Sequence, residues 1–474
     1  MQTNRPTVAR FLARKTIPFL ILPFIASYAL ASPSTYKDVC TSGCTYSTVQ
    51  AAIDSITDSS ATKVYTVFID SGVLFNNTSM TTNGKDYINF VGRGEGVSIV
   101  QATSTWFANV FSASTPSDFL DLSGSTNVTL RGFTLDARTN DPGTYTSTTF
   151  NGVKLENADR LLFDTVEIKA VNYAVWENLG TAGNLIEMFD AKLLATNTTL
   201  QTRNSTWHIF SSEIKSVQTG LESASDLAVA VNLIDGINMT IWGSHLHAES
   251  SKAGASGDVA ALRVSSAAGG SVLAVIGTQL HLKIGTTNIG SATRRMFAYL
   301  HAAAAAGVKR YDFVGSYLNY ESPASMSQGR IGGIGYSLTN ANNDISFVGG
   351  GVFDVGGSGG TYRADVVQTS SVGTAPNVKF AGFKVTSAVA AAGALPTGLG
   401  SGFQTLNTQK GSVTLASGTG TVTLPTTLPD NSYSVAVSTS VNETIRVTGK
   451  ATTGFTVTSS NGSSNATVDW IVVR

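Results

Sequence analysis

One short pattern recurs through the middle of this 474-residue chain and constrains its fold more than any other feature. It alternates apolar and variable positions and then places a small residue before a further apolar one. Its copies begin at Ile88, Val128, Leu161, Ile186, Trp207, Met239, Leu273, Tyr311, Ile345 and Val378. Period-two alternation is typical of a strand with one buried face, and the small residue permits a sharp turn. Because stacked repeats bury their apolar residues against their neighbours, the pattern predicts a parallel β-helix over residues 61–387.

The N-terminus has the three parts of a secretory signal peptide, which we place at residues 1–31. An apolar run follows a basic segment and precedes the cleavage-site tripeptide Ala29-Leu30-Ala31. The basic residues are Arg5, Arg10, Arg14 and Lys15. The alternative is an uncleaved anchor helix, but the run from Ile17 to Ala26 is shorter than the roughly 20 residues that a span needs. We therefore expect a secreted or surface protein with no membrane span after cleavage.

Residues 32–60 are expected to form an N-terminal cap. The only two cysteines, Cys40 and Cys44, lie in the exported part of the chain, so a disulfide between them is predicted. We expect no metal site at this pair, because no further cysteine or nearby histidine completes a zinc set with it. The segment from Tyr46 to Ile56 has apolar residues at helical spacing, which predicts a short helix covering the open end of the solenoid.

The first part of the solenoid carries a family resemblance. The segments Tyr46–Asp54, Val67–Leu74 and Ile88–Gly94 resemble the opening of pectinesterases and of the wider pectin-lyase-like superfamily, over residues 36 to roughly 100. The resemblance implies a right-handed parallel β-helix. It does not imply the enzyme: Gly72-Val-Leu-Phe-Asn76 stands where pectinesterases have Gly-x-Tyr-x-Glu, and the other motifs of pectinesterases and polygalacturonases are missing. No catalytic residue is carried over, and no cofactor is expected.

A different pattern follows the solenoid. Residues 388–407 are rich in Ala and Gly and are predicted to be a linker. Residues 408–474 contain six short alternating segments separated by turn clusters, which predicts an antiparallel β-sandwich. The segments Thr453–Val457 and Val468–Ile471 resemble the ending of H-type lectins and of C-terminal domains of phage tail fibres. That resemblance implies a homotrimer and sugar binding. The complete expectation is an all-β chain: capping helix, right-handed parallel β-helix and C-terminal antiparallel β-sandwich.

Aligning the repeats places outward side chains in ladders that run along the solenoid. The position before the small residue is apolar in successive copies, as Phe210, Trp242, Ile276, Val314 and Val348. An apolar ladder on an outer surface indicates a face covered by a loop or by another chain. These five residues are the candidates for an oligomer interface.

Two further ladders, on the strand after the small residue, are polar. Their members Glu167, Glu213, His245, His247, His281, Tyr317 and Asn319 are the candidates for glycan contact. Stacking places Glu213 and His281 on the coils next to His245 and His247, about 4.8 Å away. Such a carboxylate and imidazole group could bind a sugar, perform acid–base chemistry or hold a metal, and the alternative is a solvated polar face.

The charge balance narrows the function classes. Lys and Arg together number 31, as do Asp and Glu, and charged residues make up only 13% of the chain. This composition gives no support for a nucleic-acid partner. Two hypotheses remain: a non-catalytic surface protein that binds a polysaccharide or cell-surface glycan, similar to a tailspike or adhesin, and a polysaccharide lyase or hydrolase on the same fold. The fold alone does not decide between them.

Overall fold

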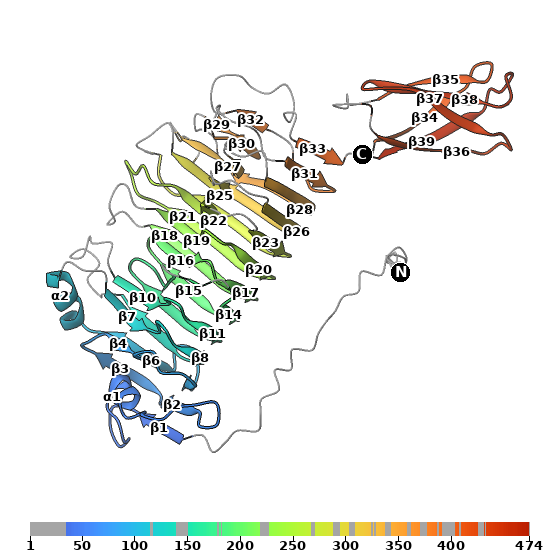
Figure 1. Ribbon diagram of the computed structural model, residues 1–474. Helices are drawn as coiled ribbons and strands as arrows, with labels where there is room; N and C mark the ends of the chain where they lie inside the picture. Colours follow the sequence, from blue (N-terminus) through green and yellow to red (C-terminus); the bar gives the residue numbers. More distant parts are fainter. Residues whose placement is uncertain are drawn as a thin grey trace, which may run out of the picture.

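The chain is described here from a computed structural model in which residues 35–473 are placed, apart from 114–116, 139–149, 178–179, 182, 219–226, 267–270, 288–293, 303–308, 324–325, 327–328, 337–342, 358–361, 370–376, 386–387, 391–402, 407–408, 425–430 and 432. The signal peptide predicted at residues 1–31 lies outside the described residues. Most of the chain forms a right-handed parallel β-helix whose coils stack along one axis (Figure 1). Among the described residues, no helix has both the length and the apolar character needed to cross a membrane.

Each full coil contributes one strand to each of three parallel faces. Face 1 contains β1 (Thr35–Val39), β2 (Tyr65–Ile69), β5 (Ile88–Gly92), β8 (Thr126–Arg131), β11 (Asp159–Asp164), β14 (Leu185–Phe189), β17 (Thr206–Phe210), β20 (Asn238–Trp242), β23 (Val272–Ile276), the first halves of β26 (Lys309–Glu321) and β28 (Asn343–Gly356), β31 (Asn377–Ala381) and β33 (Phe403–Leu406). Face 2 contains β3 (Gly72–Asn76), β6 (Ser98–Ala102), β9 (Thr134–Ala137), β12 (Glu167–Ala170), β15 (Lys192–Ala195), β18 (Glu213–Gln218), β21 (His245–Ser250), β24 (Gln279–Ile284) and the second halves of β26 and β28.

Face 3 closes the coil. It contains β4 (Met80–Thr81), β7 (Ser117–Asp121), β10 (Phe150–Lys154), β13 (Val175–Trp176), β16 (Thr198–Arg203), β19 (Ala228–Ile234), β22 (Val259–Ser266), β25 (Arg295–His301), β27 (Arg330–Tyr336), β29 (Tyr362–Arg363), β30 (Val366–Gln368) and β32 (Ala388–Ala390). β32 and β33 fall in the range expected to be a linker, and both pair in parallel with strands of the solenoid. Coil pairing therefore extends to Leu406.

The turn from face 1 to face 2 explains the small residue of the repeat. The residue at this turn has a positive φ in successive coils, for example 59° at Gly243 and 55° at Gly277. Glycine adopts this left-handed conformation without a Cβ clash, and Asp190 and Ser211 occupy the same position in two other coils. Because the corner repeats in the successive coils from β8 to β31, alternation on each side of it keeps its register from coil to coil.

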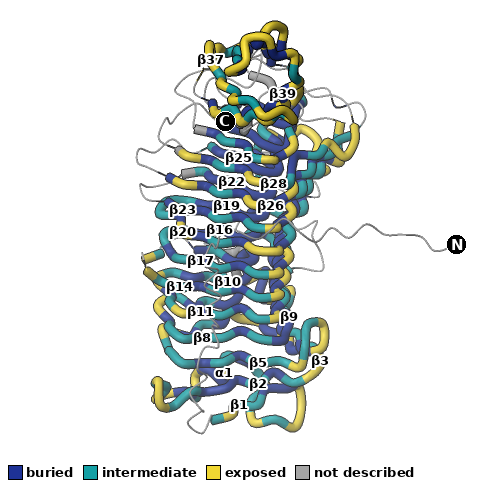
Figure 2. The backbone as a smooth tube through the Cα atoms, turned by 90° about the vertical axis from the view of Figure 1, so that its right-hand side faces the viewer, coloured by how far each residue is buried: buried dark blue, intermediate teal, exposed yellow. Residues whose placement is uncertain are grey.

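The alternating apolar residues form one continuous core inside the stack, as the buried segments along every coil in Figure 2 show. Near the C-terminal end of the stack the core is aromatic: the rings of Phe313 and Phe347 stack with centroids 4.6 Å apart, and Phe380 stacks on Phe347 at 5.2 Å. Stacked rings on adjacent coils bury large apolar areas and fix the spacing of their strands.

The N-terminal end of the stack is covered as predicted. α1 (Val49–Asp54) begins after the N-cap Thr48 and buries Val49, Ala52 and Ile53. The side-chain amide of Gln50 accepts a hydrogen bond from the backbone N–H of Thr81 at 2.7 Å and donates one to its carbonyl at 3.1 Å. Since β4 is the first strand of face 3, this pairing satisfies an open sheet edge. The predicted disulfide joins Cys40 and Cys44.

A second helix lies in the connection between β6 and β7. α2 (Ser104–Ala113) places Trp106 and Phe107 in the core, where the Trp106 ring lies 5.2 Å from that of Phe119. This helix was not predicted from the sequence.

The C-terminal sandwich is confirmed, with its six strands in two antiparallel sheets. One sheet has the order β34 (Gln409–Thr414), β39 (Thr467–Val473), β36 (Ser434–Thr439), and the other has the order β35 (Thr419–Thr423), β38 (Gly454–Ser459), β37 (Ile445–Ala451). Its core is separate from that of the solenoid and includes Phe455 and Trp470, whose rings meet edge to face at 5.6 Å. The sandwich is therefore a second packed unit.

Candidate functional site

The polar ladders of face 2 lie where the repeat placed them. In one ladder Glu213 pairs with His245, His245 with Gln279, and Gln279 with Tyr317. In the other, Lys215, His247, His281 and Asn319 follow one another on the same four coils. The outward side chains of face 2 thus form a regular grid. Neighbours on the same strand are two residues apart, and neighbours in the other direction lie on adjacent strands.

A loop after β5 covers the start of the first ladder. Its residue Gly96 donates a backbone hydrogen bond to the hydroxyl of Thr134 at 2.9 Å, and Glu95 forms an ion pair with Lys192 three coils further along. The predicted residue Glu167 lies beneath this loop, where it accepts a hydrogen bond from Thr134 at 3.0 Å and pairs with Lys169 at 2.7 Å. Glu167 is therefore already engaged by neighbouring side chains.

A polar cavity opens where the loop ends. Its volume is about 480 Å³, and it follows the corner between faces 1 and 2. Three carboxylates, one ammonium, hydroxyls and one imidazole line it, contributed by Glu95, Thr165, Asp190, Ala191, Lys192, Ser211, Ser212, Glu213, Gly243 and His245. Two predicted residues, Glu213 and His245, contribute to this cavity. Its lining side chains offer hydrogen-bond donors and acceptors next to apolar surface of similar extent, a combination that suits the hydroxyls and the C–H faces of a sugar.

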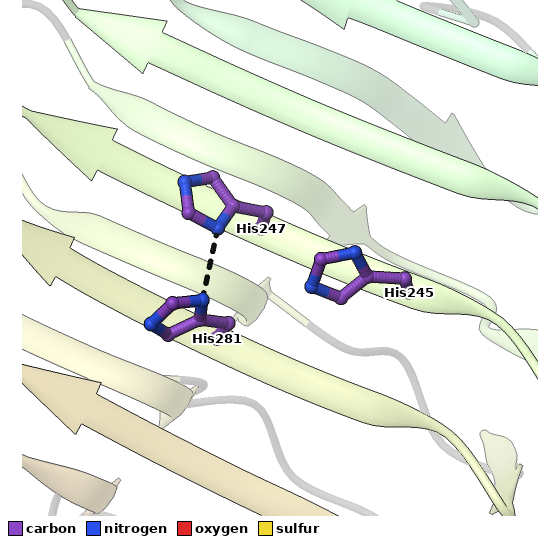
Figure 3. Close-up of side chains that lie close together, drawn as sticks. All are labelled: His245, His247 and His281. Atoms are coloured by element: carbon purple, nitrogen blue, oxygen red, sulfur yellow. Dashed lines mark hydrogen bonds between the residues drawn. The ribbon is translucent and has the colours of Figure 1, made fainter. Parts of the chain in front are cut away.

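Three histidines gather on the two coils beyond the cavity. His245 and His247 belong to β21, and His281 belongs to β24 (Figure 3). One ring nitrogen from each lies within 4.8 Å of those of the other two, and the Nδ1 atoms of His247 and His281 are 3.2 Å apart. His247 points outward but is only 6% exposed, because the other rings pack against it.

Two carboxylates face the outer nitrogens of this cluster. Nε2 of His247 lies 3.3 Å from Glu249, and Nε2 of His281 lies 3.8 Å from Glu321. Lys283 pairs with Glu249 at 3.4 Å. Neither glutamate was among the residues predicted from the sequence, although each lies two residues beyond a ladder position on its own strand.

Burial sets the protonation of the cluster. It lowers the pKa of His247 to about 4, and the neighbouring His281 adds to this effect. Burial likewise lowers the pKa of His245 and that of His281. At neutral pH the three imidazoles are therefore uncharged and hold free lone pairs.

The remaining glycan candidates lie further along the face. Tyr317 is 50% exposed, and its ring lies 5.9 Å from that of Phe353 on the next coil. Asn319 stands beside His281. Neither residue lines the cavity, so the seven candidates do not form one compact site.

The apolar ladder of face 1 is present and longer than predicted. Phe210, Trp242, Ile276, Val314 and Val348 pair in unbroken register. Phe189 precedes them and stacks on Phe210 with ring centroids 4.9 Å apart. Trp242, Val314 and Val348 are 42–43% exposed in the single chain.

No family model and no curated protein matches this chain. Among solved structures it is similar to tailspike gp61 of Pseudomonas phage phi297, with 12% identity, 87% of this chain and 67% of the other covered, and a TM-score of 0.36. It is also similar to tailspike gp49 of Pseudomonas phage LKA1, with 11% identity, 90% of this chain and 91% of the other covered, and a TM-score of 0.38. A third similar structure is the A-module of mannuronan C-5 epimerase AlgE6 of Azotobacter vinelandii, with 12% identity, 76% of this chain and 94% of the other covered, and a TM-score of 0.41. Likenesses at this level assign no activity to the chain.

Proposed function

We propose that this chain is a secreted or surface-exposed β-helix protein that binds a polysaccharide or cell-surface glycan along face 2. The observation that carries the proposal is the polar cavity of about 480 Å³ between the Glu95 loop and His245. Carboxylates accept hydrogen bonds from sugar hydroxyls, and the ammonium of Lys192 donates to sugar oxygens. A glycan is the ligand class that uses both kinds of group at high density.

The solenoid backbone supports such binding because it fixes the positions of the ladder residues in advance. A preorganised surface loses little conformational entropy when a ligand binds. The ladders also continue beyond the cavity to Tyr317, whose half-exposed ring offers a flat apolar face for a sugar ring. A chain of several sugar units fits a surface that repeats about every 4.8 Å.

A homotrimer is the second part of the proposal. The apolar ladder exposes Trp242, Val314 and Val348 in one row of the single chain. The strands β34 to β39 form a separate packed unit, in which Thr453–Val457 and Val468–Ile471 resemble segments of trimerising modules. Burying the ladder against other copies of the chain would remove this apolar surface from water.

A polysaccharide-degrading enzyme remains the alternative, because Glu95, Asp190 and Glu213 line the same cavity. Glycosidases use two carboxylates on either side of the scissile bond. The two functions differ in one product: hydrolysis or lysis of a bound polysaccharide creates new reducing ends, and binding alone does not.

The test is a glycan array with the mature chain, followed by a reducing-end assay on each glycan that binds. Glu213→Gln, His245→Ala and Tyr317→Ala should each weaken binding about 5- to 30-fold, which corresponds to the roughly 1–2 kcal/mol of a contact residue. His208→Ala is the matched control, because His208 points outward on face 1. Arg446→Ala tests a second concavity, in the sandwich, which is lined by Arg446 and by threonine and serine residues. Loss of binding in Arg446→Ala, with the face 2 variants unchanged, would place the site elsewhere.

A further inference from the structure

We propose that His245, His247 and His281 bind a divalent transition metal ion of the Zn²⁺ class, held between β21 and β24. The three side chains come from adjacent strands and lie on one face, with one ring nitrogen of each within 4.8 Å of the others (Figure 3). Imidazole nitrogen is a preferred ligand of zinc and of related metals.

The distance between the two closest nitrogens fits a shared metal ion. The Nδ1 atoms of His247 and His281 are 3.2 Å apart. Two nitrogens bound to one tetrahedral zinc at about 2.0–2.1 Å lie roughly 3.3–3.4 Å from each other. The pair needs almost no movement to take up the ion.

The carboxylates behind the rings favour the tautomer that a metal requires. Glu249 forms a hydrogen bond with Nε2 of His247 at 3.3 Å, whereas Glu321 lies 3.8 Å from Nε2 of His281, close enough for attraction but too far for a hydrogen bond. A carboxylate stabilises a proton on the nitrogen that it faces, so both Nδ1 atoms keep their lone pairs. The 3.2 Å contact is a hydrogen bond when one of the two Nδ1 atoms carries a proton. When both rings carry their proton on Nε2, the two lone pairs face each other and a metal ion between them takes the place of the shared proton. Metal-bound histidines commonly have a carboxylate in this position.

His245 supplies the third ligand. Its Nε2 atom is buried and has no hydrogen-bond partner, although a buried polar atom normally has one. One ring nitrogen of His245 already lies within 4.8 Å of those of the other two histidines. We expect a change of the His245 side-chain rotamer to bring it to bonding distance of the same ion. Three protein ligands leave the fourth tetrahedral position for water or for an incoming oxygen.

The charges around the cluster do not oppose the ion. Lys215 and Lys283 flank it, but Glu213, Glu249 and Glu321 outnumber them, and Lys283 is already paired with Glu249. Bound between β21 and β24, the ion would join two consecutive coils by coordination bonds in addition to their backbone hydrogen bonds.

The test uses the tag-free mature chain, stripped with EDTA and titrated with Zn²⁺ in a calorimeter. One Zn²⁺ should bind per chain, Mg²⁺ should not bind, and Zn²⁺ should raise the melting temperature. X-ray absorption at the zinc edge should show three nitrogen ligands. His281→Ala should lower the affinity at least 100-fold, and Glu321→Ala should lower it about 10- to 100-fold by removing the carboxylate behind the ring.

His208→Ala is the matched control and should bind Zn²⁺ as the wild type does. Glu213→Gln should weaken glycan binding and leave Zn²⁺ binding within a few-fold, so failure of the glycan proposal and failure of the metal proposal are separate results. Absence of Zn²⁺ binding by the folded wild-type chain overturns the proposal. So does unchanged binding in His281→Ala, which keeps its fold because His281 lies at the surface of face 2.

Discussion

Lys192 and Glu95 form an ion pair on face 2 although 97 positions separate them in the chain. The pair holds the end of the β5–β6 loop against β15 and closes one end of the polar cavity. Lys192→Ala should therefore weaken glycan binding about 5- to 10-fold by releasing this wall. Stability should change by less than about 0.5 kcal/mol, because Lys192 is half exposed. Affinity on an immobilised glycan and a thermal melt measure the two effects. Lys379 forms a similar ion pair with Asp344 on the outer surface of face 1. Lys379→Ala is therefore the control and should bind the glycan as the wild type does.

Substitution of Trp242 tests whether the apolar ladder of face 1 lies in a trimer interface. Light scattering on the mature chain should give the mass of a trimer, and Trp242→Asp should reduce the trimer fraction because a charge would be buried in the apolar ladder. The melting temperature of the single chain should not fall, since Trp242 is 43% exposed there. Val272→Asp is the matched control: Val272 is 44% exposed on the same face but lies outside the ladder. A monomeric wild-type chain would refute the trimer.

Glu177 is a buried carboxylate with a structural role, and its replacement by glutamine should destabilise the fold. Its Oε2 accepts hydrogen bonds from the backbone N–H of Arg203 at 2.8 Å and from Nε1 of Trp207 at 3.0 Å, and its Oε1 accepts one from Ser205. Glu177→Gln replaces one acceptor by an NH₂ group and leaves a buried donor unpaired. The free energy of unfolding should fall by about 1–3 kcal/mol. Urea denaturation measures the free energy of unfolding. Glu187→Gln, on the outer surface, is the control. A loss of stability of similar size in Glu187→Gln would count against this explanation.

His301 should make the stability depend on pH. It is fully buried on β25, where burial, and secondarily Lys309, lowers its pKa to about 3. The folded state keeps the imidazole neutral, whereas in the unfolded state it takes up a proton below about pH 6.5. Stability from this residue is therefore constant above pH 6.5 and is lost as the pH falls toward 3, by at most about 1.4 kcal/mol per pH unit.

Urea denaturation at pH 7, 6, 5 and 4 measures this dependence. His301→Gln keeps a neutral polar group beside Tyr299 and removes the titration, so its stability should fall less steeply than that of the wild type. His208→Gln is the control and should follow the wild-type slope. Identical slopes for all three proteins would show that His301 does not contribute.

The fold could be predicted from the sequence because the repeat contains both the strand alternation and the small residue at the corner. Alternation defined the strands, and the residues with positive φ, such as Gly243 and Gly277, fixed the corner that keeps all coils in register. The ladders of faces 1 and 2 followed from that register alone. The resemblance to pectinesterases implied the same fold, which the structure confirms.

The candidate site was harder to predict because its walls come from segments that the repeat does not describe. Glu95 lies in a turn between two glycines, and nothing in its neighbourhood indicates a partner 97 residues away. The outward direction of His247 followed from alternation, but its burial depends on how the imidazole rings pack, which a pattern of residue types does not encode. Glu249 and Glu321 could have been found, since they continue the same alternation.

The stacked coils also determine how the molecule responds to a pulling force. Tension along the axis of the solenoid acts on successive coil interfaces in series, so the weakest interface sets the mechanical strength of the whole stack. On face 3, β13 pairs with β10 and with β16 through only two residues each, whereas β22 pairs with β25 through five. We therefore expect the stack to yield first at a sparsely paired interface. β21 and β24 pair through six residues, so a metal ion between them would strengthen an interface that is not the limiting one.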